Sequence, residues 1–237
     1  MKKGSKILFT ILLGFSMLPA FAGKIRTEGS AMLSSGYIWR GDYVCGANFM
    51  PCIAFKYDNV QLQTYSFLAI DDSYKEIDWE LSWKVKDFTL YLADYFFLET
   101  GTGTLEDYFN FRKGETTHIQ EAIIGYEPHS IPFCARWFTF IHGDWLPSDG
   151  KPTFSSYLEL ETYHKFDSER TLSFKAGSSI FKGAYTDYTK DFAVIHLELK
   201  YAREIAFSGF SMPLSVSYVI NPDWRCAYAN ATVGIKF

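Results

Sequence analysis

Hydrophobic and polar residues alternate with a period of two along most of the chain. The last segment, Ala227–Phe237, reads AYANATVGIKF: its odd-numbered residues are apolar, and those between them are polar, small or charged. The segment 75–86 alternates in the same way, with Ile77 and Leu81 on one side and Asp78 and Glu80 on the other. A period of two indicates β-strands that each have one apolar face and one polar face.

About twelve such segments follow one another, as expected for a barrel of β-strands. We expect strands near residues 29–40, 50–57, 60–71, 75–86, 87–98, 115–127, 133–143, 153–166, 170–179, 190–202, 205–220 and 225–237. The links after the even-numbered strands are short (that after the tenth is 202–204), and most of those after odd-numbered strands are long. This asymmetry is typical of bacterial outer-membrane barrels and places both termini in the periplasm. The sequence predicts an all-β, single-domain, transmembrane, antiparallel up-and-down β-barrel.

Two residues do not follow the pattern. Asp94 falls on the lipid-facing side of its expected strand, where a charge near the membrane midplane costs several kcal/mol. We prefer a β-bulge that shifts the register there, and a position near the membrane interface is the alternative. Pro213 lies inside the eleventh strand and cannot donate to the ladder, which also indicates a bulge or a bend.

The start of the chain has the three parts of a secretory signal. A basic beginning is followed by an apolar core over residues 7–18 and by Ala20-Phe21-Ala22 before Gly23. We expect a signal peptide over residues 1–22 and the barrel over 23–237. Later segments have no run of ~18 uninterrupted apolar residues, so the membrane is expected to be crossed by strands.

Composition agrees with export to the outer membrane of a Gram-negative bacterium. Aromatic residues make up 19% of the chain, yet the mean hydropathy is −0.07. Near-neutral hydropathy is expected when lipid-facing and lumen-facing residues alternate. The net charge of −4 and the lack of a dense basic cluster argue against nucleic acid as a partner. Expected partners are outer-membrane lipid, a small solute, and the barrel-insertion machinery, which would contact the last strand ending at Phe237.

Four cysteines are too few and too scattered for a disulfide framework. Cys45 and Cys52 are close in sequence, and Cys226 begins the last strand, which must neighbour the first in a closed barrel. A bond among these three and free buried thiols both remain open. No histidine joins the cysteines at a ligand spacing, and the acidic pairs Asp71–Asp72 and Asp144/Asp149 are better explained as solvated loops than as calcium sites. We expect no metal and no cofactor.

Several motifs carry a resemblance to a known family. They are SSGYIWRG over 34–41, EIDWEL over 76–81, ADYFF over 93–97, SYLEL over 156–160, and SMPL over 211–214 followed by Asn221-Pro222. Together they resemble uncharacterised bacterial outer-membrane β-barrel proteins of the Gcw_chp type, over most of the mature chain. The resemblance implies a barrel and an outer-membrane location, but no established activity. By the same resemblance Arg40 is a feature of the family, at the outer end of the first strand, where a rim salt bridge would suit it.

The alternation assigns a set of polar side chains to the lumen. These form either a polar pore or solute site, or the internal ion pairs that fill a small barrel. Glu159 and Glu161 lie about 7 Å apart on one strand face, so they require a nearby cation. The candidates are Lys56, Asp78, Glu80, Lys84, Glu121, Arg136, Glu159, Glu161, Lys175, His196, Glu198 and Lys200.

An enzymatic reading depends on one group of loop residues. His142, Asp144 and Ser148 form the only arrangement resembling a catalytic triad. Most aromatic residues are expected in the interfacial girdles of the barrel. Those of the loop 108–111, with Leu105, are the exception and would plug the barrel mouth or bind a partner.

Three functions therefore follow from the sequence. The leading hypothesis is a passive, porin-like channel for a small solute of unknown identity. The second is a structural or interaction barrel with a closed lumen, and the third is an outer-membrane hydrolase. We expect no enzymatic activity and assign no catalytic residue.

Overall fold

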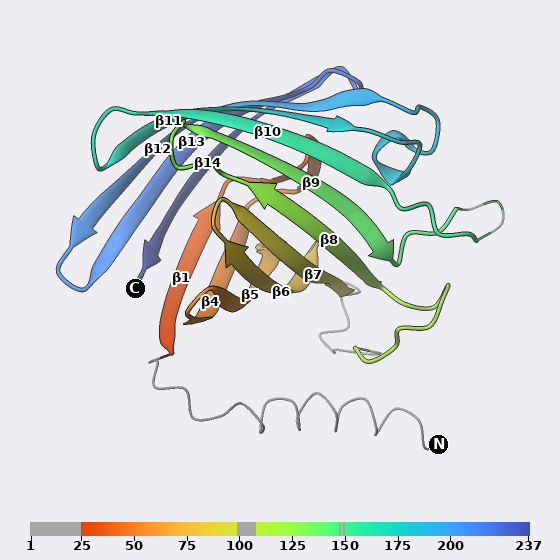
Figure 1. The fold of residues 1–237 in the computed structure, drawn as a ribbon, viewed down its shortest axis with the longest axis horizontal. Helices are drawn as coiled ribbons and strands as arrows, with labels where there is room; N and C mark the ends of the chain where they lie inside the picture. Colours follow the sequence, from red (N-terminus) through yellow and green to blue (C-terminus); the bar gives the residue numbers. More distant parts are fainter. Residues whose placement is uncertain (1–24, 99–107, 147, 149) are drawn as a thin grey trace.

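Twelve antiparallel strands close into a barrel in the computed structural model, which describes residues 25–98, 108–146, 148 and 150–237 (Figure 1). The prediction of the fold class is confirmed. In the order of the barrel, the strands are β1 (Arg26–Ser34), β4 (Asn48–Tyr57), β5 (Val60–Ala69), β6 (Lys75–Val85), β7 (Phe88–Leu98), β8 (His118–Tyr126), β9 (Phe133–His142), β10 (Ser156–Lys165), β11 (Arg170–Ser179), β12 (Ala193–Phe207), β13 (Phe210–Asn221) and β14 (Cys226–Lys236).

Two short elements stand apart from the barrel sheet. Strands β2 (Tyr37–Trp39) and β3 (Asp42–Cys45) pair with each other, and the 3-10 turn η1 (Ala184–Thr186) lies between β11 and β12. Within the described ranges, no helix is long and apolar enough to cross a membrane. The expected signal peptide, residues 1–22, lies outside the described residues.

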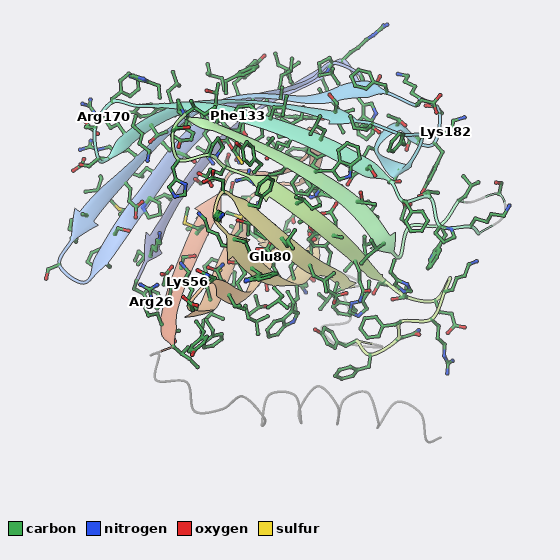
Figure 2. All side chains as sticks on the ribbon, in the orientation of Figure 1. Arg26, Lys56, Glu80, Phe133, Arg170 and Lys182 are labelled. Atoms are coloured by element: carbon green, nitrogen blue, oxygen red, sulfur yellow. The ribbon has the colours of Figure 1, made fainter. Side chains whose placement is uncertain are left out.

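The first and last strands join to close the barrel. Strand β14 pairs with β1 from Ser30↔Lys236 to Ser34↔Thr232. Beyond the first of these pairs, the Gly29 amide donates to the Phe237 carbonyl over 2.8 Å, and the Phe237 amide donates to the Gly29 carbonyl over 2.9 Å. Both described chain ends therefore lie at one end of the barrel, which we call the turn end because the short links gather there (Figure 1). The opposite end is the loop end, and Figure 2 shows Arg170 at the turn end and Lys182 at the loop end.

The outer face of the barrel is apolar around its circumference. Large apolar side chains alternate with the inward-facing positions and remain exposed on nearly every strand. A contiguous apolar surface of this size is unfavourable in water but matches the hydrocarbon of a membrane. The exposed outward residues include Leu33, Phe49, Ile53, Trp79, Leu81, Trp83, Leu90, Leu92, Ile124, Leu160, Phe174, Leu199, Val216, Val233 and Ile235.

Two features of the last strands differ from the sequence-based expectation. Strand β12 continues to Phe207 and turns at residues 208–209, so the turn expected at 202–204 is wrong. Its register with β13 runs without a shift through Glu204↔Pro213, so Pro213 forms no bulge there. The pairing of β13 with β14 instead skips residues 212 and 213, where proline has no amide hydrogen to donate.

The bulge expected at Asp94 is also absent. Pairing of β7 with β6 and with β8 continues through Trp79↔Asp94 and Asp94↔Gln120 without a register shift. Asp94 therefore lies on the outward face, and its carboxylate lies 2.9 Å from Nδ1 of His118. A local hydrogen-bonding partner, and not a change of register, accommodates this residue.

The first expected strand is divided in two. Strand β1 ends at Ser34, whose hydroxyl donates to the Gly36 carbonyl over 2.7 Å, and the chain then leaves the sheet. The Asn230 side chain of β14 accepts the Gly36 amide over 3.0 Å and holds this departure point. Residues 37–45 form the β2–β3 hairpin, whose turn at Arg40 and Gly41 has positive φ at both positions. Such a two-residue turn matches the twist of a hairpin.

The position of the apolar outer surface in the membrane can be tested by placing a charge on it. Leu81 lies outward near the middle of β6, and Val85 lies outward at its turn end. Leu81→Arg is expected to lower the free energy of unfolding in lipid vesicles by about 2–4 kcal/mol, because the guanidinium lies in hydrocarbon in the folded barrel. Val85→Arg, near the interface, should cost only about 0–1 kcal/mol. Equal costs in denaturant titrations would contradict this membrane placement.

Candidate functional site in the barrel lumen

The tip of the β2–β3 hairpin inserts a buried cation into the lumen. Arg40 is 9% exposed, and its guanidinium forms a two-pronged ion pair with Glu121 of β8, with N–O distances of 2.6 and 2.7 Å. The sequence placed Arg40 at the outer rim of the first strand, and this position is wrong. A salt bridge does form, but inside the barrel, because the chain turns inward after Ser34.

The Glu121 carboxylate is fully occupied by donors. Besides the two nitrogens of Arg40, it accepts the Tyr95 hydroxyl over 2.7 Å and the Tyr185 hydroxyl over 3.3 Å. Tyr185 also contacts the Arg40 guanidinium. Burial raises the pKa of the Tyr185 phenol well above its usual range, with the Glu121 charge adding to the effect, so the hydroxyl stays protonated. A buried ion pair is stable only when its remaining hydrogen-bonding groups are satisfied in this way.

Aromatic rings surround the same guanidinium. The centroids of Phe138, Trp39 and Tyr157 lie 4.2, 4.6 and 4.9 Å from the Arg40 guanidinium carbon. Their electron-rich faces attract a cation, most strongly where water is excluded. These rings join a buried cluster toward the loop end that also contains Tyr185, Phe140 and other apolar groups. Trp39 is thus a lumen residue and not part of an interfacial girdle.

A bulge in the sheet helps to receive the hairpin. The register of β11 with β12 shifts between Gly177 and Ser178, and Ile195 is the extra residue on β12. The alternation with Leu197 and Leu199 alone would place Ile195 on the lipid side, but the bulge turns it inward, where it is 3% exposed and belongs to the inner cluster. Its carbonyl lies where a side chain on Gly41 would be, so this position of the hairpin turn requires glycine. The Asn221 amide donates to the Gly41 carbonyl over 3.2 Å and fixes the tip.

The η1 segment closes over the hairpin from the other side. The Ala184 amide donates to the Ser155 hydroxyl over 2.7 Å, which fixes the start of η1. Tyr185 then packs its ring against Trp39 and Phe140, at centroid distances of 5.7 and 5.3 Å. Two segments from the loop end therefore meet inside the barrel and fill it there.

Toward the turn end, the inner walls surround a cavity of about 420 Å³. Its lining includes the hairpin residues Tyr37, Trp39 and Arg40, and inward side chains of most barrel strands. The charged side chains of the lining come from β6, β10, β11 and β12, apart from Arg40. They are Asp78, Glu80, Glu159, Lys175, His196, Glu198 and Lys200.

One wall carries a chain of ion pairs. Arg136 of β9 lies 3.1 Å from Glu159 and 3.6 Å from Glu161, which gives the two carboxylates of β10 the cation that their spacing requires. Lys175 lies 3.4 Å from Glu159 and 4.0 Å from Glu198. His196 follows, with Nε2 3.7 Å from Glu198. The charges on this wall therefore largely balance one another.

The remaining lumen candidates occupy separate positions. Lys56 forms an ion pair with Glu28 over 2.7 Å toward the turn end, and Lys84 is exposed beside the link between β6 and β7. Figure 2 shows Lys56 and Glu80 on the part of the barrel formed by β4 to β6. Among inward residues that sequence reasoning did not select, Glu76 is 3% exposed, although its alternation with Asp78 and Glu80 would have identified it. Tyr185 lies in a loop whose sequence gives no such signal.

The suggested triad is not assembled. Asp144 faces Thr153 and Tyr188, accepting the Tyr188 hydroxyl over 2.7 Å. His142 instead lies against Trp145, at a centroid distance of 5.2 Å. All four cysteines are free, so the alternative of a disulfide does not apply in this structure. In the described portion of the chain, no group of three or more potential ligands is placed to hold a metal ion.

The loop that follows β7 packs against the outside of the barrel. Tyr108 and Phe111 place their rings 5.3 and 4.4 Å from the ring of His118, which is fully buried on the outward face of β8. The Tyr108 carbonyl is 2.7 Å from His118 Nε2, opposite the contact with Asp94. The expectation that these aromatics plug the barrel mouth is therefore wrong. Leu105, named with them, lies outside the described residues.

Comparison with known proteins gives only distant structural matches. No protein-family model and no curated protein matches the chain. Among solved structures, a NanC porin is similar at 10% identity and a TM-score of 0.48, over 90% of this chain and 99% of its own. The COG4313 outer membrane channel from Pseudomonas putida F1 is similar at 10% identity and a TM-score of 0.44, over 92% of this chain and 98% of its own. The translocator domain of autotransporter NalP from Neisseria meningitidis is similar at 12% identity and a TM-score of 0.43, over 98% of this chain and 95% of its own. The more specific resemblance to the Gcw_chp type is not confirmed.

The closed barrel and its apolar exterior decide the location of the protein. A closed sheet has no edge strand, so its strands satisfy most of their backbone hydrogen bonds with one another and without water. With apolar side chains outward, such a barrel spans lipid, and in bacteria this architecture belongs to the outer membrane. The chain is an outer-membrane β-barrel protein with a partly filled lumen.

Removal of the Arg40 side chain tests the central ion pair. Arg40→Ala leaves Glu121 buried without its cation, so the free energy of unfolding should fall by about 3–5 kcal/mol. Arg203→Ala breaks an exposed pair with Glu169 and should have a much smaller effect. Urea unfolding in detergent micelles measures both. Similar losses for the two variants would contradict the importance of the inner pair.

The outer contact of His118 predicts the protection of one loop. His118→Ala removes the ring on which Tyr108 and Phe111 pack, so trypsin should cleave faster at Arg112 and Lys113. His129→Ala removes an exposed histidine at the turn end and serves as the matched control. Cleavage rates followed by mass spectrometry should rise only in the first variant. An unchanged rate would show that His118 does not hold the loop.

Proposed function

We propose that the protein is a passive outer-membrane channel for a small solute, exported by its N-terminal signal peptide. The observation that carries the proposal is the polar, charged cavity of about 420 Å³ in the middle of a closed barrel. Ions and small polar molecules cross lipid poorly, and a transmembrane cylinder with a polar interior is the simplest path for them.

The inserted hairpin is the constriction of this path. It enters the lumen between β1 and β4, and its tip is held by the Arg40–Glu121 pair and by Asn221. Together with η1, its tip packs into a buried aromatic cluster toward the loop end. Passage of a solute larger than water therefore depends on displacement of the hairpin. The channel is expected to be narrow and mostly closed at rest.

A closed structural barrel is the second candidate, and one observation favours it. The aromatic cluster around Arg40 is buried, and the two terminal nitrogens of Arg40 donate to the two carboxylate oxygens of Glu121. An interior filled in this way needs no transport function to explain it, since a small barrel must pack its own lumen.

Conductance of the purified protein in planar bilayers separates the two candidates. We expect the wild-type protein to give infrequent, small conductance steps. Arg40→Ala should give more frequent and larger steps, because loss of the ion pair with Glu121 releases the hairpin. Arg203→Ala, at an exposed ion pair of the turn end, should behave as the wild type.

The outcomes divide clearly. Discrete steps that grow when Arg40 is replaced support a channel constricted by the hairpin. Silence of both the wild type and Arg40→Ala, with folding verified by heat-modifiable electrophoretic mobility, would reject the channel in favour of the closed barrel.

A further inference from the structure

One wall of the cavity is acidic and lacks balancing cations. Glu76, Asp78 and Glu80 of β6 face the lumen at successive inward positions, about 7 Å apart. Glu76 accepts the Tyr74 hydroxyl over 2.6 Å, and Glu80 accepts the Gln63 amide over 2.9 Å. None of these three carboxylates belongs to an ion pair within the described residues, in contrast to the wall formed by β9 to β12.

Asp78 is the exceptional member of this group. It is 1% exposed and lines the cavity, and among the described residues no donor group lies in hydrogen-bonding geometry with either carboxylate oxygen; the neighbouring polar group is another carboxyl, that of Glu76 on the same face of β6. Burying a carboxylate without a donor is costly, so native structures provide one from the protein or from a bound molecule. Two free acceptor oxygens beside an open cavity are positioned for a donor that arrives from the cavity.

The neighbours of Asp78 add a second attraction for a cation. In the register of the sheet, it lies between Tyr65 of β5 and Tyr95 of β7, and both rings share its inward face. Both tyrosines also line the cavity. An aromatic face attracts ammonium and guanidinium groups, more strongly where the site is dry.

The overall charge of the cavity lining also favours a cation. Four carboxylates line the cavity (Asp78, Glu80, Glu159 and Glu198), against the two lysines Lys175 and Lys200. Arg40 also lines it, but its charge is balanced by Glu121. Apart from His196 and the paired Arg40, the lining has two more carboxylates than lysines, and Lys175 is already shared between Glu159 and Glu198.

We infer that Asp78, supported by Glu80 and the rings of Tyr65 and Tyr95, binds a small organic cation that carries N–H groups, an alkylammonium or a guanidinium. The N–H groups would donate to the two free oxygens of Asp78, and the tyrosine faces would contact the rest of the charged group. This inference rests on the proposed function, because a channel gives the solute access to the lumen.

Titration calorimetry with agmatine, which carries both kinds of charged group, tests the site. The detergent-solubilised wild-type protein should bind agmatine saturably. Asp78→Asn should weaken the affinity about tenfold or more, since it removes a charge-assisted hydrogen-bond acceptor. Glu80→Gln should weaken it less, because Glu80 already accepts from Gln63.

Two controls make the test specific. Glu169→Gln removes one negative charge at the exposed turn end and should leave agmatine binding unchanged. Tetramethylammonium carries the same single charge as methylammonium but has no N–H group, so it should bind at least several-fold more weakly than methylammonium. Heat-modifiable mobility verifies that each variant is folded.

Unchanged agmatine affinity in folded Asp78→Asn would overturn the inference, and so would equally tight binding of tetramethylammonium and methylammonium. Failure of the channel is distinguishable from failure of the site. A protein that is silent in bilayers but shows Asp78-dependent binding loses the channel and keeps the site. A protein that conducts ions but shows no Asp78-dependent binding keeps the channel and loses the site.

Discussion

The ion pair between Arg40 and Glu121 is the interaction on which the interior of this barrel depends. A barrel of twelve strands is too wide to be filled by its own wall side chains alone, so its lumen must be occupied by water, by a solute or by a segment of the chain. Here a hairpin enters, and a buried cation on its tip finds a carboxylate whose other contacts are two tyrosine hydroxyls. Either charge alone would be prohibitive in this position, so the hairpin and β8 are adapted to each other.

The lumen then divides into two regions with different chemistry. Toward the loop end, aromatic rings exclude water around the paired charges. Toward the turn end, the cavity remains open and its walls are charged. Of these walls, that of β9 to β12 is neutralised by its own lysine and arginine, whereas that of β6 is acidic. A uniform ring of ion pairs would suggest packing alone, and this asymmetry is what suggests a charged solute.

The alternation of residues was sufficient to predict the barrel, because a period of two assigns each strand residue to one face. It also assigned Asp78, Glu80, Glu159 and Glu198 to the lumen, where they line the cavity. It could not predict that the chain leaves the sheet after Ser34, because Tyr37 to Trp39 continue to read as a strand. Nor could it locate Tyr185 or the partner of Arg40, since loops carry no periodicity and the pair is separated by many residues. Asp94 was misjudged for a related reason: its partner His118 comes from the next strand, and local pattern says nothing of such pairs.

The hairpin is joined at both ends to strands that pair with each other, from Arg26↔Lys56 to Ser34↔Asn48. A hairpin displaced from the lumen would therefore stay tethered and could not diffuse away. Its return is a unimolecular event, and Glu121 experiences the Arg40 side chain at a high effective concentration whatever the abundance of the protein. The tip residue also holds a positive φ, so the turn and its cation are recovered together. In the proposed channel, an opened hairpin would therefore reseal without any soluble partner, at a rate set by its tether.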